Sequence, residues 1–200
     1  MAEPFTILTS LPMPLIRDNI DTDQIIPSRE MKSTGKTGLT DGLFAGWRYT
    51  AIGGREPNPD FVMNDPAFAD SKIILGGANF GSGSSREHAV WALAEYGFRA
   101  VVAQSFAPIF AGNCVRNGIL PAVLDAAAIE VIEQSCASVS IDLQAQTIGI
   151  ASGQSWSFPI EEEAKSIDAI DLSLKMAEEI TAWQDADRAL RPWIYLGANT

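Results

Sequence analysis

Apolar runs alternate with amphipathic segments between residues 72 and 124, and this alternation constrains the fold more than any other feature of the sequence. Three runs have the length and composition of buried strands: KIILGGANF, RAVVAQ and ILPAVL. The two segments between them have helical character and end near Gly97 and Gly118, since glycine commonly closes a helix. The order strand, helix, strand predicts an α/β fold with a largely parallel sheet and helices packed on it.

Before this region the sequence predicts two short β-like segments, FTILTS and PLIRDNIDTDQIIP. Residues 28–60 are rich in Gly, Pro, Lys and Thr and contain one short apolar insert, LFAGWRY. They predict a long loop system, and a loop of this size inside a compact domain usually serves a function. We expect this loop to be mobile in the isolated chain.

After the alternating region, the segment AAAIEVIEQSCA predicts another helix. The segment SVSIDLQAQTIGIASGQSWSFPI predicts a β-hairpin with its turn near Ser152 and Gly153. Residues 166–190 combine helical periodicity with strong helix formers and predict a C-terminal helix. Together these elements predict one domain over residues 1–200.

Composition and charge exclude several classes of function. The formal net charge of −11 would repel a polyanion, so we expect no nucleic-acid partner. The sequence has neither a signal peptide at its start nor an apolar run of about eighteen residues, so we expect a cytoplasmic protein without a membrane partner. Cys114 and Cys136 are the only cysteines and stand far apart, which predicts no disulfide framework and no metal or iron–sulfur site in this chain.

The stretch GSGSSREHA, residues 81–89, carries the only histidine together with two glycines, three serines and an arginine. It follows a predicted strand and opens a predicted helix, so unpaired helix amides and the positive end of the helix dipole face the loop. Gly81 and Gly83 permit positive φ and close approach of the backbone. Arg86 adds a fork of donors that suits a carboxylate or a phosphate. The stretch therefore predicts an anion site.

The same stretch allows other interpretations, and its residues argue against two of them. A dinucleotide fingerprint fails because Arg86 stands where GxGxxG requires a glycine. A serine hydrolase fails because GxSxG is absent and the only candidate base, His88, lies on the same short helix. A plain turn with Ser84 or Ser85 as the helix N-cap stays open, and a histidine such as His88 is more often a packing residue than a ligand.

A second polar cluster, formed by Asp18, Asp21 and Asp23, precedes the apolar pair of IIP. Its spacing loosely resembles a calcium loop, but the glycine and the terminal glutamate of an EF-hand do not fall in place. From the residues alone, these aspartates are turn residues.

Three motifs in order give the chain a specific resemblance to a known family. They are IDTDQIIP, then LFAGWRY with PNPDFV, then NFGSGSSREHAVWALAEYGFRAVVAQSFAPIFAGNCVRNGILP. Over about residues 5–125 the sequence resembles the small subunits of 3-isopropylmalate dehydratase, a branch of the aconitase superfamily, and the likeness is weaker after about residue 140. The resemblance implies a swivelling β/β/α domain, as in the fourth domain of aconitase.

The resemblance also implies an activity and a partner. The activity is that of a hydro-lyase that interconverts 2-isopropylmalate and 3-isopropylmalate by dehydration and rehydration in leucine biosynthesis. The implied partner is a large subunit that carries a [4Fe–4S] cluster, so we expect no cofactor on this chain and no activity without that subunit. The small-molecule ligand would be a dicarboxylate.

The resemblance assigns catalytic roles residue by residue. Ser84 is implied to be the base, acting as an alkoxide, and Asp23 is implied to lie in the polar network that faces the cluster. The loop backbone at Gly81 and Gly83 would supply N–H groups that favour the ionised serine. Such a base requires a closed site from which water is excluded.

The substrate-binding roles fall on Ser85 and Arg86, which are implied to bind a substrate carboxylate, and on Lys36 in the loop after IIP. This loop is implied to set substrate preference, and residues 28–60 are therefore the expected specificity loop. Lys36 stands where arginine is usual in the family, and an ammonium does not reproduce the planar guanidinium fork.

Two further departures are a serine, Ser82, where cysteine is common, and a shorter segment between Ile160 and Asp168. Two alternatives stand beside isopropylmalate, and the departure at Lys36 bears on the first of them. One is the same chemistry on a related diacid of the citraconate, dimethylmalate or homoaconitate type. The other is an anion-binding module without catalytic activity.

Overall fold

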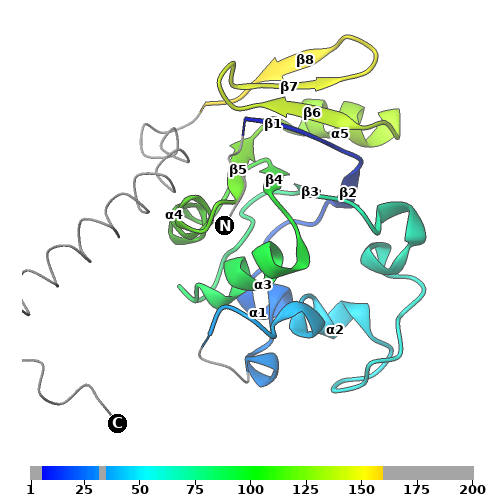
Figure 1. The fold of residues 1–200 in the computed structure, drawn as a ribbon, viewed down its shortest axis with the longest axis vertical. Helices are drawn as coiled ribbons and strands as arrows, with labels where there is room; N and C mark the ends of the chain where they lie inside the picture. The colour runs from blue at the N-terminus through cyan, green and yellow to red at the C-terminus, as the bar shows by residue number, and fades with distance from the viewer. Residues whose placement is uncertain (1–5, 32–34, 160–200) are drawn as a thin grey trace, which may run out of the picture.

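The computed structural model describes residues 6–31 and 35–159 of the chain. These residues form three layers, an antiparallel sheet, a parallel sheet and a group of helices. In Figure 1 the antiparallel sheet lies at the top, the parallel sheet in the middle, and the helices α1, α2 and α3 below. This β/β/α order confirms the predicted fold class.

The middle layer is a parallel sheet with the strand order β2-β3-β4-β5. Its strands are β2 (Pro12–Leu15), β3 (Ile73–Gly76), β4 (Ala100–Ala103) and β5 (Leu120–Val123). Every residue of β3 and β4 is buried because both faces of the sheet are covered. Ile74 packs into the core on the helix side, and Ile73 and Leu75 pack into the core on the other side. The three strands predicted between residues 72 and 124 are confirmed.

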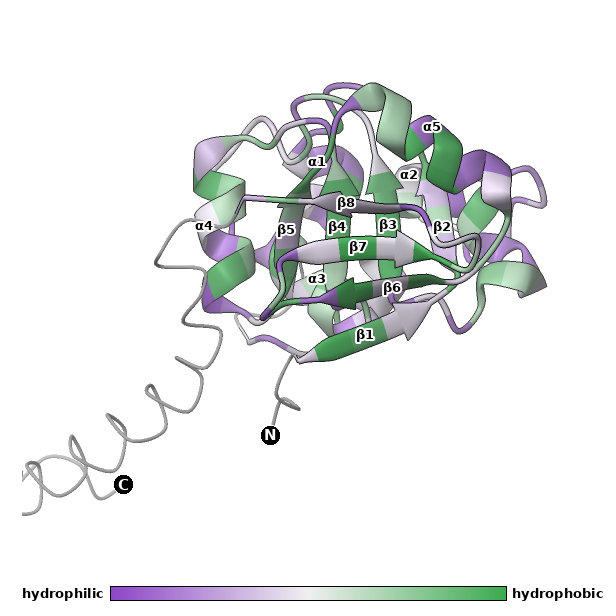
Figure 2. Cartoon of the chain, turned by 90° about the horizontal axis from the view of Figure 1, so that it is seen from above, coloured by the Kyte–Doolittle hydropathy of each residue, from purple (hydrophilic) through white to green (hydrophobic). Residues whose placement is uncertain are grey.

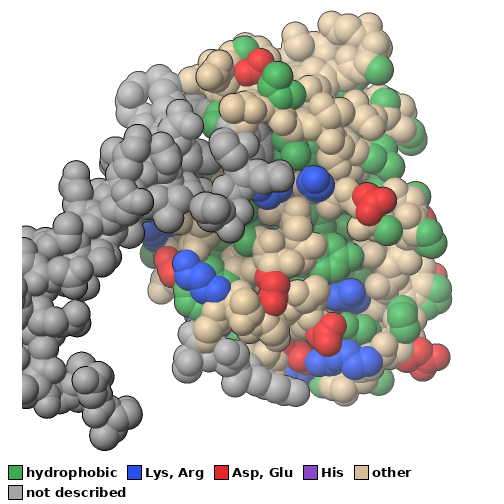
Figure 3. All heavy atoms as spheres, viewed as in Figure 1, with side chains coloured by type: hydrophobic (Ala, Val, Ile, Leu, Met, Phe, Trp, Pro, Cys, Tyr) green, Lys and Arg blue, Asp and Glu red, His purple; other side chains and the backbone are tan. Residues whose placement is uncertain are grey.

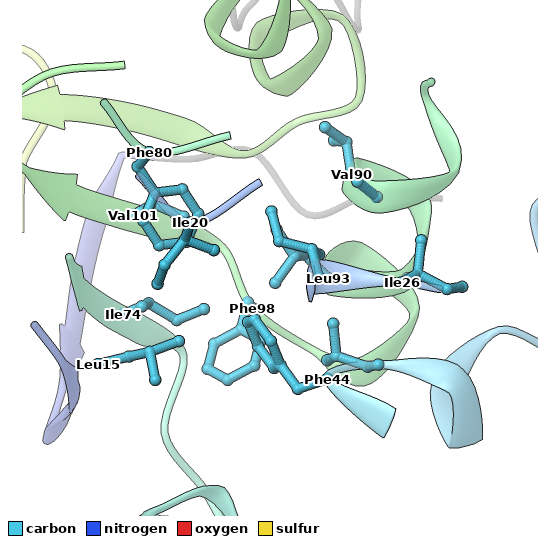
Figure 4. Packing of buried hydrophobic residues seen from close by; sticks show 14 of the residues in the cluster. Leu15, Ile20, Ile26, Phe44, Ile74, Phe80, Val90, Leu93, Phe98 and Val101 are labelled. Carbon is cyan, nitrogen blue, oxygen red and sulfur yellow. The ribbon is translucent and has the colours of Figure 1, made fainter. Parts of the chain in front are cut away.

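Helices cover one face of this sheet. They are α1 (Thr22–Ile25), α2 (Ala45–Arg48), α3 (His88–Tyr96) and α4 (Pro108–Arg116). Short 3₁₀ turns lie between them, at η1 (Ser28–Glu30), η2 (Thr40–Gly42), η3 (Val62–Asn64) and η4 (Pro66–Phe68). Figure 4 shows Ile74 of the sheet, Leu93 of α3 and Phe44 meeting in their shared core. As predicted, α3 closes at Gly97, whose φ is +116°.

The second sheet is antiparallel, with the strand order β1-β6-β7-β8. Its strands are β1 (Ile7–Ser10), β6 (Val139–Asp142), β7 (Thr147–Ile150) and β8 (Ser155–Ser157). Figure 2 shows this sheet lying across the parallel one, with apolar stretches on the strands of both. The helix α5 (Ala126–Ser135), which was predicted, packs Ala128, Ile129 and Ile132 into the core between the sheets.

The predicted hairpin needs a correction. Its turn near Ser152 and Gly153 is present and joins β7 to β8, and Gly153 has a φ of +90°. A further turn at residues 143–146 joins β6 to β7, so the segment forms three strands rather than two. Its positive-φ residue is Gln146, a type that gives no turn signal, and the turn was therefore missed.

The segment 28–60 is also more structured than a long loop. Leu39, Leu43 and Phe44 are fully buried in the helix-side core. The buried carboxylate of Glu30 forms a 2.6 Å ion pair with Arg55, which connects the two ends of the segment. The described residues of this segment therefore pack onto the domain, although its mobility in the isolated chain stays a prediction.

The C-terminal helix predicted at residues 166–190 and the shortened segment between Ile160 and Asp168 lie outside the described residues. Within the part of the chain that the structure describes, no helix has the length and apolar character needed to cross a bilayer.

Candidate functional site

The loop after β3 runs beside the segment before α1, which brings the two polar motifs of the sequence together. The amide of Gly81 donates to the carbonyl of Ile20 at 2.7 Å, and the amide of Thr22 donates to the carbonyl of Ser82 at 2.8 Å. A parallel bridge pairs Asp21 with Ser82. Backbone hydrogen bonds therefore contribute directly to holding the two motifs side by side.

Two glycines of this loop adopt the positive φ that their residue type was expected to permit. Gly81 has a φ of +78° and Gly83 a φ of +91°, values that residues with a side chain rarely adopt. A methyl group on Gly81 would also overlap the ring of Phe110. A methyl group on Gly83 would lie 3.3 Å from Cβ of Asp21, in the neighbouring segment.

Thr22 holds the backbone of Ser84 from both sides. Its hydroxyl accepts a hydrogen bond from the Ser84 amide and donates one to the Ser84 carbonyl, each at 3.1 Å. Thr22 is 3% exposed, so these two bonds are shielded from water, and Ser84 itself is half-buried. The backbone of Ser84 is therefore fixed by a residue 62 positions earlier in the chain.

Asp23, Ser28 and Arg86 form a closed polar triangle next to this loop. Nη1 of Arg86 lies 2.7 Å from Oδ1 of Asp23 and 2.7 Å from Oγ of Ser28, and that hydroxyl donates to the same Oδ1 at 3.0 Å. The hydrogen bond from Ser28, together with the bond and charge of Arg86, lowers the pKa of Asp23 despite some desolvation. At neutral pH the triangle therefore contains a carboxylate and a guanidinium.

The start of α3 differs from the plain-turn interpretation. Glu87 is the N-cap and its side chain makes no capping hydrogen bond, so neither Ser84 nor Ser85 caps the helix. The first helical residue is His88, four positions after Ser84, and the helix dipole acts on Ser84 from farther away than the sequence predicted. His88 packs its ring against Trp91, with centroids 4.7 Å apart, as the packing interpretation predicted.

Ser85 and Lys36 lie on the side of the loop that faces α4. The carbonyl of Ser85 is 3.5 Å from Nδ2 of Asn113. Nζ of Lys36 donates to Oδ1 of Asn117 at 3.1 Å and lies 5.5 Å from the centre of the Trp91 ring. Among the described residues, no hydrogen bond joins Lys36 to Ser84, Ser85, Arg86 or Asp23, so the structure brings Ser84, Arg86 and Asp23 together and places Lys36 to one side.

The other two aspartates of the first motif have local roles. Asp21 caps α1 in a capping box with Gln24, and Asp18 accepts a hydrogen bond from the amide of Ala78. Over residues 6–31 and 35–159, no three His, Cys, Asp or Glu side chains form a group that could hold a metal ion. Burial raises the pKa of the Cys114 thiol, and Cys136 is exposed at the end of α5. The described residues thus do not fit the ligation of a cluster.

One face of the described domain carries charges of both signs (Figure 3). On the face seen in Figure 3, Lys and Arg side chains lie among Asp and Glu side chains rather than in one continuous basic patch.

Sequence reasoning missed three residues of this site, Thr22, Ser28 and Asn113. Thr22 precedes Asp23 in the first motif and Ser28 directly follows that motif, and their hydroxyls give no signal of their own in a polar stretch. Asn113 carries a detectable signal, because it is a buried polar residue in the middle of an apolar helix.

Comparison with known proteins identifies the family of the chain. The family model described as the aconitase C-terminal domain matches residues 2–127. A 3-isopropylmalate dehydratase small subunit from Cupriavidus necator is 48% identical, over 96% of this chain and 98% of its own length. This chain belongs to the family of 3-isopropylmalate dehydratase small subunits, which carry the aconitase C-terminal domain. The small subunit of this family from Neisseria meningitidis serogroup C is 42% identical, over 96% of this chain and 99% of its own length.

A solved structure extends the family likeness to the fold. The crystal structure of 3-isopropylmalate dehydratase from Methanocaldococcus jannaschii is similar to this chain with a TM-score of 0.66 and 28% identity. The likeness covers 89% of this chain and 99% of that one. This chain therefore shares its overall fold with that dehydratase structure.

Proposed function

We propose that this chain is the small subunit of a cytoplasmic hydro-lyase that interconverts 2-isopropylmalate and 3-isopropylmalate, and that it works only with a large subunit. The observation that carries the proposal is the near full-length identity of 48% to a protein named 3-isopropylmalate dehydratase small subunit. The contact between the loop 81–86 and the segment 21–28 supports it, since this contact brings the proposed base and the proposed carboxylate-binding residue into one region.

The reaction removes a proton from a carbon next to a carboxylate and expels a hydroxyl group, and water is later added back. It requires a base, cations for the carboxylates and an acid for the departing hydroxyl. The large subunit would supply the last of these, because a [4Fe–4S] cluster bound there acts as a Lewis acid. This chain would supply the base and the cations.

The proposed base is the hydroxyl of Ser84. In water a serine hydroxyl does not ionise near neutral pH, so its surroundings have to favour the alkoxide. Arg86 lies two positions along the loop and brings a positive charge, and the positive φ of Gly83 shapes the backbone just before the serine. The buried hydroxyl of Thr22 holds the Ser84 backbone in place, so that little rearrangement is needed when the proton moves.

The proposed carboxylate site is Arg86 with Ser85. Asp23 and Ser28 both contact Nη1 of Arg86, and they fix the plane of the guanidinium. A guanidinium fixed in this way can present its remaining N–H donors to a carboxylate with little further loss of side-chain entropy. Asp23 would thus orient the binding residue rather than bind substrate itself.

The same chemistry on a related diacid is the second candidate, and one observation favours it. Lys36 is held by Trp91 and Asn117 and presents an ammonium rather than a fork. A single point charge accommodates carboxylates of several geometries. Diacids of the citraconate, dimethylmalate or homoaconitate type would therefore be accepted if Lys36 faces the variable part of the substrate.

The test is anaerobic co-expression with the large subunit encoded in the same genome, followed by assay of the unsaturated diacid. Turnover of 3-isopropylmalate faster than that of a citraconate-type substrate supports the proposal, and the reverse order supports the second candidate. Ser84→Ala should abolish turnover and leave substrate binding largely intact. Ser82→Ala, a control in the same loop, should retain turnover. Anion binding without turnover of any diacid would indicate a binding module and would refute both candidates.

A further inference from the structure

The carboxylate of Glu95 accepts hydrogen bonds from three consecutive backbone amides. The amide of Gly38 lies 2.6 Å from Oε1, and the amides of Leu39 and Thr40 lie 2.6 and 3.1 Å from Oε2. On the other side of this turn, Nη1 of Arg48 donates to the carbonyl of Thr40 at 2.8 Å. One side chain of α3 therefore fixes the backbone of residues 38–40.

The same face of α3 also holds Lys36. Trp91 and Glu95 are four positions apart, so their side chains lie on one face of the helix. Lys36 lies over the ring of Trp91, and Oδ1 of Asn117 accepts hydrogen bonds from both Lys36 and Trp91 at 3.1 Å each. We refer to Trp91 and Asn117 as the Lys36-binding pair.

The two contacts are coupled by the short length of chain between them. Lys36 is two residues before Gly38, and two residues span at most about 7 Å. Gly38 has a φ of +81°, which turns the chain between the two contacts. Once the amides of residues 38–40 are held, the backbone of Lys36 can reach only a small volume beside α3.

We propose that Glu95 is a positioning residue that holds Lys36 at the Lys36-binding pair and so determines which diacid the enzyme prefers. The selectivity part of this inference rests on the function proposed above. Glu95 is exposed and outside the hydrophobic core, whereas Leu39 is fully buried and anchors the same segment independently. A change at Glu95 should therefore alter the position of Lys36 without unfolding the domain.

The first measurement is hydrogen exchange on the full-length chain, comparing Glu95→Gln with Glu133→Gln. Glu133 is an exposed glutamate of α5, so its variant removes the same charge far from the segment. In Glu95→Gln the exchange of amides 38–40 should rise about tenfold, since each loses a charged acceptor. Glu133→Gln should leave these amides unchanged. Equal exchange in both variants would refute the role of Glu95.

The second measurement is steady-state kinetics in the complex with the large subunit, on 3-isopropylmalate and a citraconate-type diacid. Glu95→Gln should raise KM for the preferred diacid about tenfold and keep kcat within about twofold. Glu95→Asp, which keeps a carboxylate, should recover part of the loss. Exchange that rises without a change in KM would show that Glu95 supports the fold alone.

A double variant tests whether Glu95 acts through Lys36. If it does, Lys36→Met combined with Glu95→Gln should have the KM of Lys36→Met alone, because the second change removes nothing further. Additive losses would refute the coupling. A wild-type complex that turns over no diacid would instead refute the proposed function and the selectivity with it, whatever the exchange of amides 38–40.

Discussion

The guanidinium of Arg86 lies 2.7 Å from the carboxylate of Asp23, although 63 positions separate the two residues in the sequence. The contact is possible because the backbone of the loop 81–84 is hydrogen-bonded to residues 20–22. Asp23, in the first polar motif, therefore orients the guanidinium of Arg86 in the second motif.

Removing the charge of Asp23 should loosen Arg86. In Asp23→Asn we expect KM for the diacid to rise about tenfold, since the guanidinium loses a charge-assisted hydrogen bond. Steady-state kinetics in the complex measure the effect. Asp60→Asn, at an exposed position, is the matched control, and an equal KM in both variants would argue against orientation by Asp23.

Thr22 can be tested with a substitution of nearly the same shape. Thr22→Val removes the hydroxyl that bonds the amide and carbonyl of Ser84, and these partly buried groups lose that partner. We expect the free energy of unfolding to fall by about 1–3 kcal/mol and kcat to fall with it. Thr22→Ser retains the hydroxyl and should stay close to wild type. Chemical denaturation of both variants measures the free energy of unfolding, and steady-state kinetics of both variants measure kcat.

The loop glycine Gly81 should not tolerate a side chain. Gly81→Ala places a methyl group at positive φ, which costs about 1–2 kcal/mol, and drives it into the ring of Phe110, which adds about 1–3 kcal/mol. Gly53 has nearly the same φ, +75°, with no atom close to the new methyl group. Gly53→Ala should therefore show only the backbone effect. Equal losses of unfolding free energy would contradict the predicted overlap.

The stabilisation that Glu95 gives by hydrogen-bonding the amides of residues 38–40 should depend on pH. Burial alone would raise the pKa of Glu95, but the hydrogen bonds from Gly38, Leu39 and Thr40 lower it by more. A pKa that is lower in the folded state means that the ionised carboxylate stabilises the fold at neutral pH. This contribution should decline as the pH falls below the unfolded value of about 4.3 and through the lowered pKa.

The measurement for this prediction is the difference in urea midpoint between wild type and Glu95→Gln. The difference should be larger at about pH 7 than at about pH 3, because protonation of Glu95 makes the wild type resemble the variant. A difference that is the same at both pH values would contradict the lowered pKa.

The sequence predicted the central part of the fold well. The strands β3, β4 and β5 are short apolar runs with clear boundaries, and burial on both faces of the sheet demands such runs. The burial of the segment 28–60 was missed because Leu39 stands alone among turn residues, and the insert that begins with Leu43 and Phe44 is too short to show strand or helix periodicity. Tertiary packing, rather than local preference, orders them.

The site was predicted in its residues but not in its contacts. Ser84, Arg86 and Asp23 came from motifs, and their roles stay predictions. The triangle of Asp23 with Arg86 joins two distant segments, and no spacing within either motif could indicate it. The hydroxyl of Thr22 bonds Ser84, and the hydroxyl of Ser28 accepts a hydrogen bond from Arg86, so a polar turn in the sequence gave no sign of either contact.

The pairing of β1 with β6 affects how the chain is made. Thr9 and Ser140, which face each other across these strands, are 131 positions apart. At a synthesis rate of about 5–20 residues per second, β1 emerges roughly 6–26 s before its partner. During that time its apolar residues and its unpaired amides are accessible to chaperones and proteases. The antiparallel sheet is therefore completed late in translation. Until β6 is made, β1 stays unpaired and exposed to chaperones and proteases.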